Sequence, residues 1–210
     1  PPKISEVCSL GIGEISNAVS VGFLFNDSEI SDTKIYLSQI RVTKMSYEEA
    51  DKSLDENTSL SMLNEIAKDH KKYRDSNGAI RLDLPKADIR VKDQKVIVLP
   101  QLKSESREMV SELMVLAGRA IAQYSIENNI SMPYLSQASG KFSEEIILNI
   151  HNLSLSKTFE AVKGFSRSKL SSKPSLHAGL GLESYIRVTS PMRRYLDLLV
   201  QQQLINYLAG

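Results

Sequence analysis

The sequence has no tryptophan, a single cysteine, few aromatic residues and no long apolar run. One cysteine excludes an intramolecular disulfide framework and any metal site built from several cysteines. No apolar stretch approaches the roughly 20 residues that cross a bilayer, so no membrane span is expected. Residues 1–6 resemble neither a signal peptide nor a transit peptide. We therefore expect a reducing, cytoplasmic location, with an organelle as the alternative.

The sequence also has little net charge, because 26 Lys and Arg stand against 25 Asp and Glu, which gives +1. This balance excludes a whole-chain electrostatic signature for nucleic acid or membrane. The charge is nevertheless uneven, since residues 156–195 carry eight basic and two acidic side chains. This asymmetry predicts a local site for a polyanion, and a solvated basic face is the alternative reading.

The length of 210 residues, with 41% hydrophobic and 24% charged, is typical of one globular domain or a large part of one. No repeat or linker divides the chain. Apolar residues recur with period two in some segments and with helical spacing in others. The sequence therefore predicts an α+β fold in which antiparallel hairpins pack with several helices.

Two hairpins are predicted from β-branched and aromatic runs that flank polar turns. Residues 17–25 and 33–43 lie on either side of a polar turn at 26–29. Residues 79–84 and 94–99 flank Lys92-Asp93, and a proline follows each of these two runs.

Helices are predicted from caps and spacing. Ser46 and Glu49 form a capping box, so a helix should start there with Tyr47 in its first turn. A second helix should follow a break near Asn57 and end at Asn77-Gly78. The remaining helices are predicted for residues 104–128, 141–151 and 155–165.

The predicted long helix at 104–128 has one apolar face that includes Leu116 and Ile121. It also carries the small residues Ala117, Gly118 and Ala120 close together. We expect another element to approach its backbone closely there.

The segment from Thr189 to Tyr195 predicts an anion site. Ser190 is a good N-cap and Pro191 suits the first helical position, so Arg193 and Arg194 would fall in the first turn of a helix. Positive side chains there oppose the helix dipole by about 0.3–1 kcal/mol, and a bound phosphate would reverse that penalty. The alternative is that both arginines pair with Asp or Glu elsewhere in the chain.

Residues 177–185 (HAGLGLESY) and 188–195 (VTSPMRRY) resemble the signature near the end of the catalytic domain of the ribonuclease II / ribonuclease R family. The resemblance covers nearly the whole chain, and residues 109–137 are most similar to the cyanobacterial and plastid branch. It implies that residues 1–210 are the C-terminal portion of an RNB-type exoribonuclease catalytic domain, and the absence of an initiator Met fits a chain that starts inside a longer protein.

The family degrades single-stranded RNA processively from the 3′ end and releases nucleoside 5′-monophosphates, with Mg²⁺ held by the cluster Asp-x5-Asp-x-Asp-Asp. Neither Asp27 and Asp32 nor Asp51 and Asp55 continue into that pattern. The resemblance therefore implies that the Mg²⁺ ligands lie upstream and that this chain holds no metal. It also implies single-stranded RNA as the partner of a monomer.

The matched motifs also imply roles for single residues. Arg193 falls where the family has the arginine that contacts the phosphate at the scissile end and supports the transition state. Arg194 and Ser190 are expected to contact RNA beside it. Tyr47 matches the tyrosine that reaches the 3′-terminal nucleotide, and its alternative role is packing under a helix start.

Other matched positions depart from the family pattern. Leu82 stands where well-studied members have a phenylalanine that stacks on the terminal base, a contact worth about 1–3 kcal/mol per base. Glu112 is retained near the terminal ribose, but Ser111 replaces the glutamate before it. His177 follows the pattern as an RNA contact, although a lone histidine is more often structural. Gln201 replaces a common histidine.

Two other functions compete with the exoribonuclease. A degenerate domain of the same fold would bind RNA without hydrolysing it, and an intact upstream aspartate cluster would argue against that. An unrelated α+β domain could instead bind a small phosphorylated ligand at its Ser-Pro-Met-Arg-Arg segment.

Overall fold

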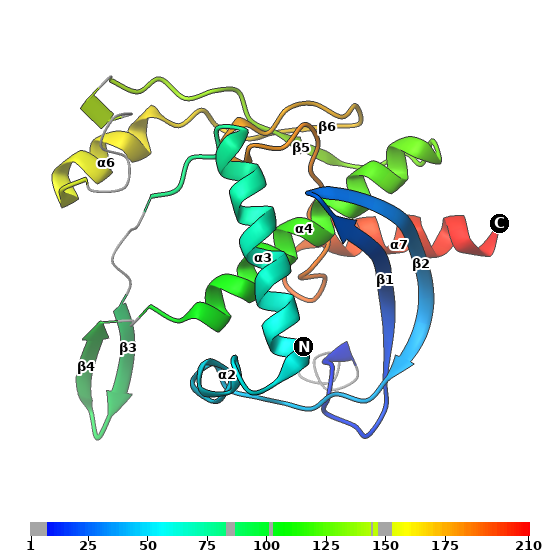
Figure 1. Cartoon of the computed structure of the whole chain (residues 1–210), viewed down its shortest axis with the longest axis horizontal. Coiled ribbons are helices and arrows are strands. Elements are labelled where there is room, and N and C mark those ends of the chain that lie inside the picture. Colours follow the sequence, from blue (N-terminus) through cyan, green and yellow to red (C-terminus); the bar gives the residue numbers. More distant parts are fainter. Residues whose placement is uncertain (1–7, 83–86, 101–102, 144, 147–152) are drawn as a thin grey trace.

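The computed structural model describes residues 8–82, 87–100, 103–143, 145–146 and 153–210. Helix α4 runs through its middle, α3 crosses α4, and the β1–β2 hairpin curves along one side (Figure 1). The elements in chain order are β1 (Ser16–Asn26), β2 (Glu29–Ile40), α2 (Tyr47–Ser53), α3 (Thr58–Ser76), β3 (Ala87–Lys92), β4 (Lys95–Pro100), α4 (Glu105–Glu127), β5 (Tyr134–Ser136), α6 (Leu155–Gly164), β6 (Lys169–Ser171), the short 3₁₀ helix η1 (Ala178–Leu180) and α7 (Tyr195–Ala209).

The first predicted hairpin is confirmed. Strands β1 and β2 pair antiparallel, and Asn26 faces Glu29 across the turn. Asp27 and Ser28 have positive φ angles of 48° and 68°, as a two-residue turn with the twist of a hairpin requires. Asp32, with φ of 48°, lies where the register shifts, so it belongs to a bulge.

The second predicted hairpin exists, but its first strand was predicted in the wrong place. Strand β4 agrees with residues 94–99, whereas its partner β3 begins at Ala87. Asp93 and Gln94 form a two-residue turn with positive φ, and so short a turn pairs β4 with the residues directly before it. Residues 79–82 form no strand, and their backbone bonds to other segments instead: the N–H of Ile80 donates to Gly179 O at 3.3 Å.

The helix predictions are largely confirmed. Ser46 and Glu49 form the capping box of α2, Asn57 caps the start of α3, and α3 ends at Ser76 with Asn77 as its C-cap. Helix α6 lies within the predicted residues 155–165, and most of the predicted helix at 141–151 lies outside the described residues. None of the helices in the described part of the chain is long and apolar enough to span a membrane.

The largest core cluster joins α4 to the C-terminal third of the chain. Ile121 of α4 packs with Ile186 and Val188, and with Val200 and Leu204 of α7. Strand β2 and the β5 region complete this cluster. The expected close approach to α4 is also present: a Cβ added to Gly118 would collide with the carbonyl oxygen of Ile186. The segment before the turn at 190–194 is thereby held against α4.

Candidate functional site

The turn that precedes α7 carries the two arginines. Arg193 N–H and Arg194 N–H both donate to the carbonyl oxygen of Ser190, at 3.3 and 3.1 Å. Arg194 is extended, with φ of −131° and ψ of 117°, and is itself the N-cap of α7, which begins at Tyr195. The prediction that Ser190 caps this helix was therefore wrong, because the extended Arg194 separates the turn from α7.

Asp197, in the first turn of α7, connects the helix to this turn. Its carboxylate is fully buried. Oδ2 accepts from the Ser190 N–H at 2.9 Å and from Arg194 Nε and Nη2 at 3.0 and 2.7 Å. The negative charge of Asp197 also suits the positive end of the helix dipole. Arg194 is therefore paired within the chain, as the alternative reading of the arginines expected.

Arg193 differs from its neighbour. Its side chain is exposed, and its guanidinium makes a long contact of 3.4 Å from Nη2 to Ser190 Oγ. Within the described residues no carboxylate lies within ion-pair distance of it. Arg193 is thus available to bind an anion together with the Ser190 hydroxyl.

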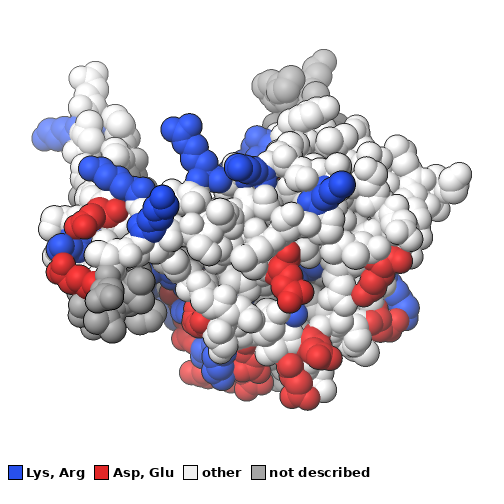
Figure 2. Space-filling model, turned by 90° about the horizontal axis from the view of Figure 1, so that it is seen from above, with Lys and Arg blue, Asp and Glu red and all other residues white. Residues whose placement is uncertain are grey.

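The eight basic residues of segment 156–195 differ in whether they are paired. Lys157 and Arg194 are paired with carboxylates. Figure 2, which looks down on the side that carries α6 and β6, shows most Lys and Arg along one half of the face and most Asp and Glu along the other. The remaining six basic residues of the segment are exposed and have no ion pair in the described part of the chain: Lys163, Arg167, Lys169, Lys173, Arg187 and Arg193.

The loop that contains His177 packs against the end of α3. His177 N–H donates to Leu182 O at 2.8 Å, and Arg74 Nε donates to Leu180 O at 2.8 Å. Gly181 has φ of 63°, and a Cβ there would press on the Arg74 carbonyl at 2.5 Å. At Gly179 a Cβ would meet Gln137 Oε1, so the Gln137 side chain would have to shift. The glycines of HAGLGLESY thus permit close packing.

His177 itself is buried, and its ring meets that of Tyr185 edge-on with centroids 5.8 Å apart. Burial lowers the pKa of His177, and the charges of Arg187 and Arg74 act in the same direction. The imidazole is therefore neutral at pH 7. Its Nδ1 has no hydrogen-bond partner among the described residues.

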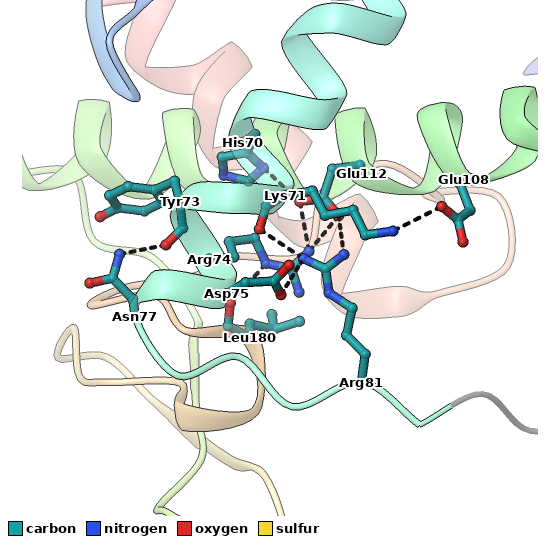
Figure 3. Close-up of polar contacts among 10 residues, drawn as sticks. All are labelled: His70, Lys71, Tyr73, Arg74, Asp75, Asn77, Arg81, Glu108, Glu112 and Leu180. Carbon is teal, nitrogen blue, oxygen red and sulfur yellow. Dashed lines mark hydrogen bonds and ion pairs between the residues drawn. The ribbon is translucent and has the colours of Figure 1, made fainter. Parts of the chain in front are cut away.

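Glu112 lies in a buried polar network between α3 and α4 (Figure 3). Arg74 Nη1 donates to both of its oxygens, at 2.8 and 2.7 Å, and His70 Nδ1 lies 2.8 Å from Oε1 in a bent geometry. Burial alone would raise the pKa of Glu112, but His70 and Arg74 outweigh it and hold that pKa below its usual value. The carboxylate is ionised and is already occupied within the protein.

Leu82 is half-buried and directly follows a residue that reaches this network. The residue before it, Arg81, donates from Nη2 to Lys71 O at 3.1 Å and pairs with Asp75 at 3.0 Å. Arg81 Nη1 also lies 4.0 Å from Glu112 Oε2 (Figure 3). The contacts of Arg81 therefore hold the backbone that carries Leu82 against the end of α3.

Tyr47 lies elsewhere, in the first turn of α2 beside the start of α4. Its side chain is exposed, and Arg107 stacks over its ring at 4.3 Å from the centroid. Its carbonyl accepts from Ser106 Oγ at 3.1 Å, and Asp51 Oδ1 accepts from Ser106 N–H at 2.7 Å. The Tyr47 ring is therefore partly exposed while Arg107 covers it from one side.

The predicted site residues thus occupy three places. Arg193, Arg194 and Ser190 share one turn, Glu112 of α4 and the segment with Leu82 lie beside the end of α3, and Tyr47 lies at the start of α2. The His177 loop contacts both helices around the second place, because Leu180 O accepts from Arg74 of α3 and the segment after it packs on Gly118 of α4.

Sequence reasoning did not assign a role to Asp197 or Arg74. For Asp197 a signal existed, since a carboxylate three residues after an arginine can pair with it at a helix start. For Arg74 none existed, because its partner Glu112 is 38 positions away.

The described residues do not fit a metal site. No three side chains of His, Cys, Asp or Glu in this part of the chain gather closely enough to hold a metal ion. The Mg²⁺ site expected from the resemblance is therefore not formed by them.

Comparison with known proteins decides the family. The family model described as RNB domain matches residues 1–210. The chain belongs to the RNB-domain family. An uncharacterized ribonuclease of Synechocystis is 33% identical over 219 residues, with all of this chain and 33% of that protein covered. The chloroplastic/mitochondrial ribonuclease II of Arabidopsis thaliana is 28% identical, with all of this chain and 28% of that protein covered.

These relatives bear out the predicted resemblance to the cyanobacterial and plastid branch. The chain spans about a third of the length of the curated relatives that it matches. Among solved structures, Mycoplasma genitalium RNase R in complex with ribose-methylated single-stranded RNA has a TM-score of 0.81 at 20% identity, covering 97% of this chain and 39% of that one.

A second solved structure, yeast Ssd1, is described as a pseudonuclease. It has a TM-score of 0.68 at 17% identity, with 97% of this chain and 30% of that chain covered. Both likenesses show that the RNB fold is shared, which confirms the predicted α+β architecture.

Proposed function

We propose that the chain is part of a 3′-to-5′ exoribonuclease that hydrolyses single-stranded RNA to nucleoside 5′-monophosphates. The supporting observation is the exposed, unpaired guanidinium of Arg193, on a turn where the neighbouring Arg194 is neutralised by Asp197. The family and its ribonuclease relatives favour RNA as the phosphate-bearing ligand.

In this proposal Arg193 binds the phosphate that is attacked. Hydrolysis adds water across the bond between phosphorus and the 3′ oxygen, which yields a nucleoside 5′-monophosphate and a new 3′ hydroxyl. Negative charge builds up on the phosphate oxygens in the transition state. A guanidinium placed against them stabilises that charge, and the Ser190 hydroxyl offers a second contact to the RNA backbone.

The other predicted residues either contact RNA directly or act through the segments that they hold in place. The exposed ring of Tyr47 stacks on or bonds the 3′-terminal nucleotide, and Leu82 packs against its base without π-stacking. Glu112 and His177 act on RNA through the segments that they hold in place, because both are buried and Glu112 is bonded to Arg74. The six unpaired basic residues guide the strand by contacts to its phosphates.

The proposal includes dependence on Mg²⁺, because ribonucleases of this family generally need a divalent metal. The ligands of that ion are assigned to residues outside the described part of the chain. It also includes a monomeric enzyme in the cytoplasm. The organellar Arabidopsis relative makes an organelle the alternative location.

The test compares Arg193→Ala with Lys173→Ala in the full natural polypeptide, with 5′-labelled single-stranded RNA and Mg²⁺. Loss of one preorganised donor lowers kcat by about 10²–10³-fold, so Arg193→Ala should slow turnover to that extent. It should weaken RNA binding only a few-fold, because one phosphate contact among several is lost. Lys173→Ala, which removes an exposed unpaired charge from the basic segment 156–195, should weaken binding and leave kcat unchanged.

The outcomes separate the alternatives. Unchanged turnover in Arg193→Ala contradicts the catalytic role. Binding of single strands without shortening, with or without chelator, identifies a degenerate RNA-binding domain. Binding of a mononucleotide as tight as that of a longer strand would point instead to a site for a small phosphorylated ligand.

A further inference from the structure

The two oxygens of the buried Asp197 carboxylate differ in their hydrogen bonds. A carboxylate loses its hydration on burial and needs compensation. Oδ2 receives all three hydrogen bonds, two from Arg194 and one from the Ser190 N–H. Oδ1 is buried as well and has no hydrogen-bond partner in the described part of the chain. The burial of this charge therefore depends on one counter-ion and one backbone N–H.

The contacts of Asp197 hold both sides of the turn. The N–H of Ser190 is bound by a side chain seven residues later, and the carbonyl of Ser190 accepts from the N–H groups of Arg193 and Arg194. Ser190 is therefore tied to α7 and to the turn at once. The backbone of Arg193 lies between these ties, so its position is fixed while its side chain stays exposed.

The same contacts decide which arginine can meet a ligand. Arg194 turns its guanidinium toward Asp197, with Nε and Nη2 on one carboxylate oxygen. A phosphate that took Arg194 away would leave Asp197 buried without its counter-ion, which is strongly unfavourable. The turn thus presents one free positive charge, that of Arg193.

We propose that Asp197 is a positioning residue for RNA hydrolysis: it fixes the turn at 190–194 and withholds Arg194 from the RNA, so that Arg193 alone meets the reacting phosphate. This inference rests on the proposed function of Arg193.

The test is Asp197→Asn in the full natural polypeptide, with kcat on single-stranded RNA and the salt dependence of RNA binding as readouts. Asparagine retains an acceptor oxygen at nearly the same size but loses the charge, so Arg194 is released. We expect kcat to fall at least tenfold while RNA binding at low salt is not weakened. The slope of log affinity against log salt should become steeper by about 0.7, the value for one additional phosphate contact on a single strand.

Two comparisons make this slope informative. Arg193→Ala should make the slope shallower by about 0.7, because it removes a phosphate contact. Asp32→Asn is the matched control, since it removes an exposed carboxylate that pairs with Lys34 at 2.9 Å, at a positive φ that asparagine tolerates. It should change neither kcat nor the slope. A purely structural Asp197 would lower the folded fraction without altering the slope of the folded molecules.

Wild-type kcat and slope in Asp197→Asn would overturn the inference. If Arg193→Ala also kept wild-type kcat, the proposed function would fail first, so the two failures are distinguishable. If Asp197→Asn does not fold, the double variant Asp197→Asn with Arg194→Gln removes both charges together. Its kcat should be reduced at least tenfold with a wild-type slope, and wild-type kcat in the double variant would also overturn the role of Asp197.

Discussion

The buried network at Glu112 offers a quantitative test of the fold. Arg74 is 5% exposed and donates to both oxygens of Glu112, and His70 lies against the same carboxylate with no exposure at all. Replacing Glu112 with alanine leaves Arg74 charged and buried without its counter-ion. Removing one partner of a buried ion pair lowers the free energy of unfolding by about 3–5 kcal/mol. This loss is several-fold larger than the median contribution of a surface pair.

The effect should appear as local opening of α3 and α4. Hydrogen exchange of the amides in these two helices, measured on the full natural polypeptide, reports the free energy of opening without requiring the whole chain to unfold at once. A loss of about 3 kcal/mol corresponds to exchange that is at least a hundredfold faster. The Arg74 contact to Leu180 should weaken with it, so amides of the His177 loop should also exchange faster.

The matched control is Glu108→Ala, one turn earlier on α4. Glu108 pairs with Lys71 at 3.0 Å, but its side chain is 70% exposed, and such surface pairs contribute about 0–1 kcal/mol. Both pairs join α4 to α3, so the comparison isolates burial (Figure 3). Equal exchange rates in the two variants would refute the reasoning. A Glu112→Ala protein with wild-type exchange and altered preference for RNA over DNA would instead assign this carboxylate to the ligand.

The remaining predictions concern pH and glycine. Burial lowers the pKa of both His70 and His177, so the unfolded chain binds more protons than the folded one as pH falls. The free energy of unfolding should be at its maximum above about pH 7 and should decrease as the pH falls below about 6.5, the histidine pKa of the unfolded chain. Thermal midpoints that rise on acidification would contradict this. Gly181→Ala should destabilise by more than Gly78→Ala in denaturant titrations, because both have positive φ but only Gly181 meets another backbone, at Arg74. Equal losses of stability in the two variants would mean that the loop at Gly181 shifts to accommodate the added methyl group.

Local rules in the sequence were sufficient for most secondary structure. The capping box at Ser46, the cap at Asn57 and the apolar face of residues 104–128 each act within a few residues, so α2, α3 and α4 could be predicted. The resemblance of residues 177–195 to the RNB family was likewise readable in the sequence alone, and the family match over the chain confirms it.

Tertiary contacts decided the rest. The strand predicted at 79–84 was misplaced because residues 79–82 bond to α3 and to the His177 loop, which lies about a hundred positions later. Glu112 looked like a ligand residue, and only the packing of α3 on α4 shows that Arg74 occupies it. Likewise, spacing alone presents Arg193 and Arg194 as two adjacent basic residues, and only the family resemblance marks Arg193 as the catalytic one. The fold separates them, because a buried carboxylate at Asp197 neutralises Arg194 and leaves Arg193 facing solvent.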